Sequence, residues 1–294
     1  MALHVTNGDI TVDLLERSGI SEPILAWRDA LHDGPVVDGP DRIRLRTEFL
    51  GADPREFEAR DRTLDSHAGD YVLWFEADLY DQLQIAEILA RLARVDPARI
   101  RLRQIGEHVG IAHFGGLGQL EPEQLPALPE TPLSADALRL GADAWRALTA
   151  PDPAGLLEIP RSGELRFIRE AFVRLAQEYP WVRDGLSLSE RRLLASAPGT
   201  REELFERAWR KEARPFMGDT FAFARLDRLA PLLRRDGEVL RLDDDGARIL
   251  AGDGDFVHEF GIDRWVGGVH LAGREAAWRW DEGTERLVYA PVRA

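Results

Sequence analysis

Cysteine is absent from this chain of 294 residues. The absence excludes disulfide bonds, catalytic thiolates and zinc sites built on sulfur, so any metal ion must be held by histidine, aspartate or glutamate. Lysine is nearly absent too, since Lys211 is the only one among 38 basic residues. There is also no Gly-x-Ser-x-Gly segment. These absences disfavour covalent catalysis through lysine or a serine elbow.

Long apolar runs are missing as well. No run approaches the length of about 18 residues that a membrane-spanning helix needs, and no basic segment followed by an apolar one opens the chain. We therefore expect a cytoplasmic protein with no membrane partner. The net charge of −14 disfavours broad attraction to nucleic acid, and a hydrophobic content of 44% predicts a folded protein with more than one domain.

Strand-like and helix-like segments alternate through the first part of the chain. Apolar runs predict strands at residues 2–6, 24–27, 72–75 and 100–105. Helices are expected over residues 9–18, over a mostly exposed stretch at 42–67, and around the apolar stripe of Ile85, Ile88, Leu89 and Leu92. Asp9 is expected to cap the first helix and Gly19 to end it. This alternation predicts an α/β domain over residues 1–130 with a parallel, Rossmann-like sheet.

Helical signals dominate the rest of the chain. A helical extension is predicted over residues 131–184, and a winged-helix-like module with a closing hairpin over residues 185–294. Capping boxes that begin at Ser187 and Thr200, a helix near residues 219–229 and a hairpin turn at Asp236-Gly237 support the module. Tryptophan-rich segments predict the closing strands at residues 262–271 and 277–289.

Three carboxylates follow the third predicted strand. Glu76, Asp78 and Asp81 lie between a buried strand and a helix, where parallel sheets keep their ligands. Glu76 and Asp78 are candidate catalytic groups and ligands of a divalent metal ion, and Asp81, Tyr80 and Gln82 are candidate ligand contacts. A structural interpretation is open beside this one, because Asp78 is suited to capping the helix and Asp81 to its first turn.

A second polar turn follows the first predicted strand. Residues 4–9 (HVTNGD) place His4, Asn7 and Asp9 around a strand-to-helix turn, and backbone amides at a helix N-terminus attract anions. We predict that these three residues bind ligand. The alternative for His4 is a buried histidine whose hydrogen bonds are satisfied within the fold.

A third polar turn follows the second predicted strand, at residues 27–35 (WRDALHDGP). Asp29 and His32 are candidate catalytic residues there, with His32 as general base or metal ligand. Turn chemistry alone explains Asp33 and the Gly34-Pro35 pair. We expect the three turns to bring their ionisable side chains into one pocket.

A glycine-rich loop follows the fourth predicted strand. His108 and His113 flank residues 115–118 (GGLG), which would let the backbone approach a ligand. The glycines are equally explained as ordinary loop residues, and that interpretation is the one we favour from the sequence.

Four segments together resemble the signature segments of a bacterial family known as domain of unknown function 1835 (DUF1835): residues 4–9, 27–35, 74–83 and 262–271. The resemblance spans nearly the whole chain, and the block at 74–83 (WFEADLYDQL) is specific. The family often has histidine at the position of Ala77, so a ligand set based on that histidine is weakened here. The resemblance implies an architecture and a set of site residues, and it implies no activity.

The leading interpretation is a pocket that binds a small molecule, with a divalent metal ion as the possible cofactor, and that has hydrolase-like chemistry. The alternative is a ligand-responsive transcriptional regulator or a protein-interaction module that acts through residues 185–294. Residues 185–235 contain eleven basic and seven acidic side chains, but acidic residues crowd the predicted wing at 236–245. A protein partner is therefore favoured over DNA for this module. A scaffold without chemistry is the third possibility.

Overall fold

A computed structural model describes residues 1–111 and 114–290 of the chain. Its N-terminal part is built on a five-stranded sheet of order β2-β1-β3-β4-β5. The strands are β1 (Ala2–Thr6), β2 (Ile24–Ala26), β3 (Asp70–Glu76), β4 (Ile100–Ile105) and β5 (Glu130–Pro132). The first four are parallel, whereas β5 runs antiparallel at the edge. The prediction of an α/β fold with a largely parallel sheet is confirmed, and β5 was not predicted.

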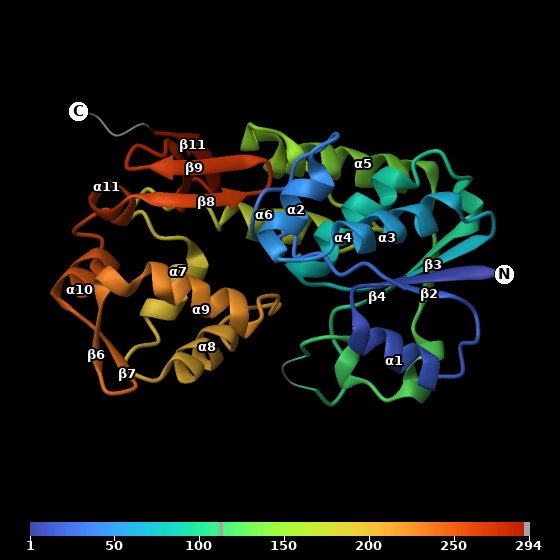
Figure 1. The fold of residues 1–294 in the computed structure, drawn as a ribbon, viewed down its shortest axis with the longest axis horizontal. Coiled ribbons are helices and arrows are strands. Elements are labelled where there is room, and N and C mark those ends of the chain that lie inside the picture. The colour runs from blue at the N-terminus through green and yellow to red at the C-terminus, as the bar shows by residue number, and fades with distance from the viewer. Residues whose placement is uncertain (112–113, 291–294) are drawn as a thin grey trace.

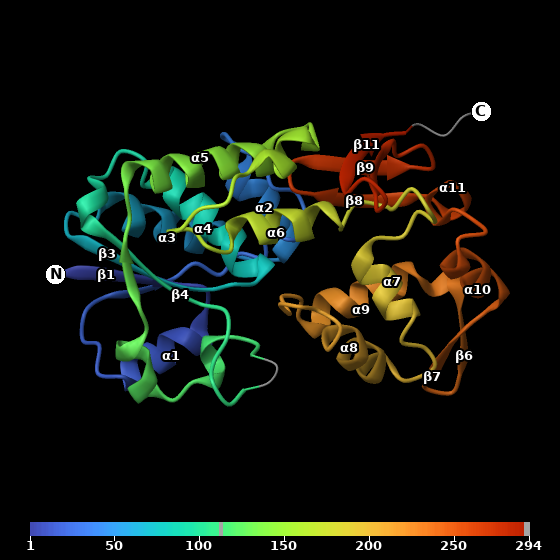
Figure 2. The same cartoon turned by 180° about the vertical axis from the view of Figure 1, so that it is seen from behind.

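Helices cover both faces of this sheet (Figures 1 and 2). One face carries α2 (Arg42–Leu50), α3 (Pro54–Ser66), α4 (Leu79–Arg91), α5 (Ala135–Thr149) and α6 (Ile168–Ala176). The opposite face carries α1 (Asp9–Arg17) and short 3-10 segments within residues 117–127. Successive side chains of β3 point to opposite faces of the sheet, which explains the two layers. Leu73 and Phe75 belong to the buried cluster with α4, whereas Val72 and Trp74 belong to the cluster with α1.

Two local predictions in this part need correction. Asp9 is the first residue of α1 rather than its cap; the N-cap is Gly8, which has no side chain to accept a hydrogen bond. The stretch over residues 42–67 is two helices, because Gly51 ends α2 in the left-handed conformation and Asp53 caps α3. The two helices were predicted to be mostly exposed, but one face of the pair is buried, and arginines such as Arg46 are among its buried side chains.

A second buried cluster, between Leu186 and Phe256, marks what we call the helical unit (residues 186–260). It contains α7 (Leu188–Leu194), α8 (Arg201–Trp209), α9 (Asp219–Arg228), β6 (Leu233–Asp236), β7 (Val239–Leu242), α10 (Asp244–Ala251) and α11 (Phe256–Phe260). Both predicted capping boxes are present, and so is the hairpin of β6 and β7. The helices α10 and α11 were not predicted, and the winged-helix likeness stays a prediction.

The chain closes with two antiparallel hairpins, where a single closing hairpin was predicted. They comprise β8 (Ile262–Val266), β9 (Val269–Gly273), β10 (Trp278–Asp281) and β11 (Arg286–Tyr289). Their buried side chains, such as Val266 and Trp280, belong to the same cluster as the sheet. The turn at Gly268 also donates a backbone hydrogen bond to the Leu148 carbonyl of α5, at 2.8 Å. The last strands therefore return to the α/β part, with the helical unit inserted before them.

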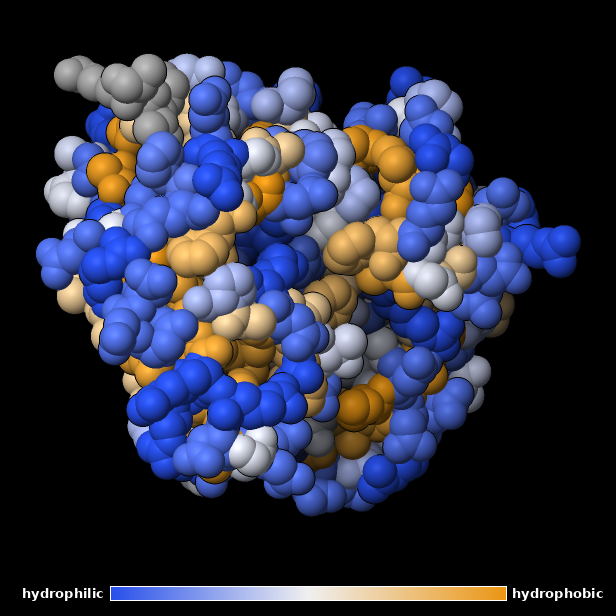
Figure 3. Space-filling model, turned by 60° about the vertical axis from the view of Figure 1, so that its left-hand side comes forward, coloured by the Kyte–Doolittle hydropathy of each residue, from blue (hydrophilic) through white to orange (hydrophobic). Residues whose placement is uncertain are grey.

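On the face drawn in Figure 3, hydrophilic residues dominate the rim, and hydrophobic residues show between them toward the hollowed middle. None of the helices in the described part of the chain is both long enough and apolar enough to span a membrane.

Candidate functional site

The candidate site lies beyond the carboxyl ends of β1 and β3, which are neighbours in the sheet. A pocket of about 350 Å³ opens there. Residues of the first two polar turns line it together with the glycine-rich loop and one tryptophan of the helical unit: Asn7, Gly8, Asp9, Ile10, Thr11, Glu76, Tyr80, Gly115, Gly116, Gly118, Gln119 and Trp209. A small hollow beside it is lined by Glu76, Asp78, Gly106 and Arg214, among others.

Glu76, Asp78 and Asp81 form what we call the carboxylate cluster. One oxygen of each lies within 4.8 Å of the others, and each side chain is buried. Strand and helix boundaries place them: Glu76 ends β3, Asp78 is the N-cap of α4, and Asp81 lies in the first turn of that helix. The structure thus brings together the three carboxylates that the sequence singled out.

Hydrogen bonds fix two of the carboxylates in place. The amide of Asn7 donates to Asp81 Oδ1 at 2.9 Å, and the backbone N–H of Glu76 donates to Asp81 Oδ2 at 2.5 Å. Asp78 Oδ1 accepts from the backbone N–H of Asp81 at 3.0 Å, and Gln82 donates to the Glu76 carbonyl at 2.6 Å. Both oxygens of Asp81 are therefore engaged by N–H donors, whereas the side chains of Asp78 and Glu76 share a hydrogen bond.

The glycine-rich loop closes over Glu76. The backbone N–H of Leu117 donates to Glu76 Oε1 at 2.6 Å. Gly116 has a φ of +139°, and a Cβ atom there would lie 2.1 Å from Glu76 Oε2. Only glycine allows this approach to Glu76. An approach of residues 115–118 to a ligand stays a prediction. His113 lies outside the described residues, and His108 accepts or donates a hydrogen bond with Gln124 at 3.2 Å.

The environment favours the protonated form of these acids. Burial raises the pKa of Glu76 well above its ordinary value, and the charges of Asp81 and Asp78 add to the shift. Burial raises the pKa of Asp81 in the same way, with Asp78 adding to it. The pKa of Asp78 rises to about 6 through burial, although hydrogen bonds from the Asp81 and Tyr80 backbone oppose the shift. A bound cation would relieve this unfavourable electrostatic arrangement.

No arginine, lysine or histidine among residues 1–111 and 114–290 forms an ion pair with the carboxylate cluster. Arg214 lines the hollow beside Asp78, and its charge helps to keep the pKa of Asp78 from rising further. Its guanidinium is already engaged: Nη1 donates to the Gly106 carbonyl at 2.9 Å and Nε to Glu170 at 3.1 Å.

Arg214 and Trp209 come from the helical unit, more than 100 positions after the strands that carry the acids. Sequence reasoning did not assign either residue to the site. Neither lies in a motif, and nothing local in the sequence signals that the connection between α8 and α9 reaches the sheet.

The three residues predicted to bind ligand in the second polar turn, at residues 4–9, have different surroundings in the structure. Asn7 and Asp9 line the pocket, although Asp9 is also ion-paired with Arg28. His4 lies within β1, where Nδ1 accepts from the Trp74 indole at 2.9 Å and Nε2 is 3.3 Å from Glu22. Both ring nitrogens of His4 are thus engaged within the fold, as the structural alternative expected.

Asp29 is not brought to the carboxylate cluster. It is buried and accepts from Arg46 Nε at 3.0 Å and from Arg46 Nη2 at 2.6 Å, while Arg60 lies 3.8 Å away. Its backbone carbonyl accepts from Gln84 of α4 at 2.9 Å. Asp29 therefore joins α2 and α3 to α4, and its charge is neutralised by arginine.

His32 lies behind the pocket wall. Its ring is 5.8 Å from the ring of Tyr80, which lines the pocket, and it also contacts Phe216 and Phe221 of the helical unit at 5.3 and 4.9 Å. Both ring nitrogens are buried and have no hydrogen-bond partner among the described residues. Burial lowers the pKa of His32 to about 4, so the ring is neutral near pH 7. It is not among the side chains that converge with Glu76 and Asp78.

Chemically, the cluster offers hard oxygen ligands in a partly buried site. A divalent cation would take the place of the proton that the side chains of Glu76 and Asp78 share, and Asp81 adds negative charge. Such a set suits Mg²⁺, Mn²⁺ or Ca²⁺ better than a metal that prefers nitrogen or sulfur.

No protein-family model matches the chain, and no curated protein matches it. The resemblance to the DUF1835 family stays a prediction.

Proposed function

We propose that the pocket at the ends of β1 and β3 binds a divalent cation and, through it, a small polar ligand. Glu76 and Asp78 are the cation ligands in this proposal, and Asp81 orients the backbone of Glu76 while it contributes charge. The observation that carries the proposal is the convergence of three buried carboxylates within 4.8 Å without a paired basic side chain in the described part of the chain. Burying like charges in this way is unfavourable unless a cation or protons neutralise them.

The surroundings favour a ligand with an oxyanion group. Bare carboxylates repel a phosphate or a carboxylate, so such a ligand requires the cation as a bridge. Arg214 lies beside Asp78 as a second positive group. The N-terminus of α1 also meets the pocket at Gly8, where no side chain caps the helix. Without a cation the same pocket suits a cationic ligand or a neutral polyol.

Hydrolase-like chemistry would add a proton transfer. In the pocket without a cation, Asp78 is the group suited to this role, because burial raises its pKa to about 6. Asp29 and His32 are not proposed as catalytic residues, since Asp29 is paired with arginine and His32 lies behind Tyr80.

Cation binding is tested by titrating the protein with Mn²⁺ in a calorimeter and by following its melting temperature. We expect wild-type protein to bind Mn²⁺ and to melt at a higher temperature, with a gain of about 2.7 kcal/mol in unfolding free energy when the free ion is at 100 times its Kd. Glu76→Gln and Asp78→Asn should lose both effects. Asp143→Asn removes an exposed carboxylate of α5 and should behave as wild type. Absence of binding by Mg²⁺, Mn²⁺ and Ca²⁺ alike would rule out the metal proposal.

A second candidate, regulation through the helical unit, is favoured by one observation: this unit supplies Trp209 and Arg214 to the pocket. A ligand there would contact both parts of the chain. The order of α7, α8, α9 and the β6–β7 hairpin is what a winged-helix-like module requires.

Protein contact is the form of regulation that the charges favour. Of the eleven basic residues counted between positions 185 and 235, seven are ion-paired with carboxylates: Arg191, Arg192, Arg201, Arg207, Arg210, Arg214 and Arg225. Few are left for phosphate contacts. A mobility-shift assay at low salt tests the DNA-binding version, and we expect no shift; a salt-sensitive shift would favour a transcriptional regulator.

A further inference from the structure

Helix α5 lies at the outer edge of the α/β part, on the side away from the helical unit (Figures 1 and 2). Its inner face is buried through residues such as Ala144 and Leu148. The outer face has four charged side chains, and between 48% and 81% of each is exposed: Asp136, Arg139, Asp143 and Arg146. Steps of three and four residues place all four on one stripe of the helix.

A groove of about 690 Å³ runs beside this stripe. Its apolar lining comes from Leu140 and Ala147 of α5 and from Ile159 and Pro160 of the segment that follows the helix. Seven charged side chains also line it, four of them acidic and three basic. Because the whole chain has a net charge of −14, this is a nearly neutral surface on a strongly acidic protein. A second copy of the chain meets little local repulsion there.

The charged stripe of α5 is complementary to itself. Its charges run negative, positive, negative, positive along the helix, so the reversed order is opposite in sign at every position. When two copies of α5 lie antiparallel about a two-fold axis level with Gly141, Asp136 of one copy is opposite Arg146 of the second. Arg139 is likewise opposite Asp143 of the second copy. All four pairs across such an interface are attractive, whereas parallel helices in register would place like charges opposite each other.

Pairing within one copy does not prevent this exchange. Arg139 pairs with Asp136, and Arg146 pairs with Asp143 at 2.8 Å. Exposed ion pairs of this kind contribute little to stability, so their replacement by pairs across an interface costs little. An interface also covers the apolar side chains of the groove, which ion pairs within the helix leave exposed.

We infer that the chain forms a two-fold symmetric homodimer through α5 and the groove beside it. Two-fold dimers are the commonest oligomers, and each requires a patch that is complementary to itself. The charges of α5 set the antiparallel orientation and the register, and burial of the apolar groove supplies attraction. The inference does not depend on the proposed function, because none of the residues that line the pocket at β1 and β3 lines the groove.

Analytical ultracentrifugation at physiological salt tests the inference, since long-range repulsion between the acidic chains is then screened beyond about 8 Å. We expect a dimer for the wild-type protein. Arg139→Asp and Asp143→Arg should each raise the dimer dissociation constant by about tenfold or more, because like charges then face each other at two symmetry-related places. An equimolar mixture of the two variants should dimerise again, since the mixed dimer has opposite charges at both places.

Matched controls separate pairing at α5 from a change in net charge. Arg62→Asp and Glu58→Arg reverse an exposed pair of α3, change the net charge by the same amounts, and should leave the dissociation constant unchanged. A wild-type monomer at every concentration would overturn the inference and leave the groove to a different partner. So would a dimer that the α5 variants do not weaken, or a mixture that associates no better than either variant alone. Mn²⁺ binding by the α5 variants should equal that of wild type, so the proposed function is judged separately.

Discussion

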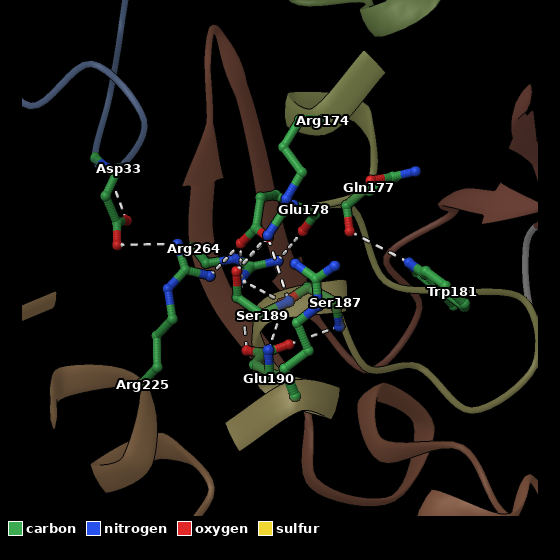
Figure 4. A network of polar contacts seen from close by, with 12 residues as sticks. Asp33, Arg174, Gln177, Glu178, Trp181, Ser187, Ser189, Glu190, Arg225 and Arg264 are labelled. Atoms are coloured by element: carbon green, nitrogen blue, oxygen red, sulfur yellow. Dashed lines mark hydrogen bonds and ion pairs between the residues drawn. The ribbon is translucent and has the colours of Figure 1, made fainter. Parts of the chain in front are cut away.

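Two groups of buried acids in this protein have pKa values that are shifted in opposite directions. In the carboxylate cluster, Glu76, Asp78 and Asp81 face one another, and burial raises the pKa of each. In the network of Figure 4, burial alone would raise the pKa of Glu178, but Arg225, Arg174 and Arg264 together lower it well below its ordinary value. Burial is common to both, so the difference lies in the neighbours.

The difference separates a structural site from a candidate binding site. Glu178 accepts from Arg174 Nη1 at 2.7 Å and from Arg225 Nη1 at 2.5 Å, and it joins α6 to α9 and β8. Its charge is already balanced within the fold. The carboxylate cluster has no such balance among the described residues, and an external cation is the simplest way to provide it. The predictions below test this contrast.

The largest effect is expected for Glu178→Gln. The substitution removes the carboxylate shared by the buried Arg225 and Arg264 and by the partly buried Arg174, and removal of one partner from a buried pair costs about 3–5 kcal/mol. Urea denaturation measures the loss. Glu206→Gln, which removes an exposed partner of Arg210, should leave stability nearly unchanged. Equal effects of the two variants would show that the network contributes no more than a surface pair.

His32, at the junction of the two regions, should make the protein sensitive to acid. Its pKa in the folded state is about 4, below the ordinary 6.5, so the neutral form is favoured by folding. The stability that depends on neutral His32 is fully present above pH 6.5 and is lost as the pH falls toward 4. We expect the unfolding free energy to fall by about 2 kcal/mol between pH 7 and pH 5 for this reason. Denaturation of wild type and His32→Phe across this range measures it. A difference in unfolding free energy between wild type and His32→Phe that does not change with pH would contradict the prediction.

Asp78→Asn should act in the opposite direction to Glu178→Gln and stabilise the protein. The folded-state pKa of Asp78 is about 6, above the ordinary 3.8, so its ionised form weakens the fold above pH 6 and ceases to do so as the pH falls toward 4. Asparagine can still cap α4. We expect a gain of about 1–2 kcal/mol at pH 8 without added metal, shrinking at pH 4. Loss of stability at pH 8 would mean that the carboxylate is balanced within the protein after all.

The smallest effect on stability is expected for Arg228→Gln, which compares an arginine without an ion pair with the arginines that pair with Glu178. Burial and the neighbouring Arg225 and Arg264 lower the pKa of Arg228 to about 10, and it forms no ion pair in the described part of the chain. Its replacement should change the unfolding free energy by less than about 1 kcal/mol. A loss as large as that of Glu178→Gln would show that Arg228 belongs to the balanced network.

Much of the fold and part of the site follow from local sequence patterns. Apolar runs identified β1 and β3, and their pairing brings Asn7 beside Glu76 and Asp81. Two of the three turns expected to share a pocket therefore meet, whereas Asp29 and His32 of the third turn do not line it. The capping residues of α4, α7 and α8 were recognisable from a few neighbouring positions. The prediction of Asp29 as a site residue did not foresee its ion pairs, because the arginines that pair with it come from α2 and α3 and form no sequence motif with it.

The sequence by itself determined where strands end, which residues cap the helices, and that any metal site must be built from oxygen or imidazole ligands. These features depend on a few neighbouring residues or on composition. Only the tertiary structure decided which acids are paired with arginines, that Gly116 lies against Glu76, and that the connection between α8 and α9 places Arg214 beside Asp78. The physical reason is that the state of a buried charge is set by groups within a few ångströms in space, and here these groups come from segments far apart in the chain.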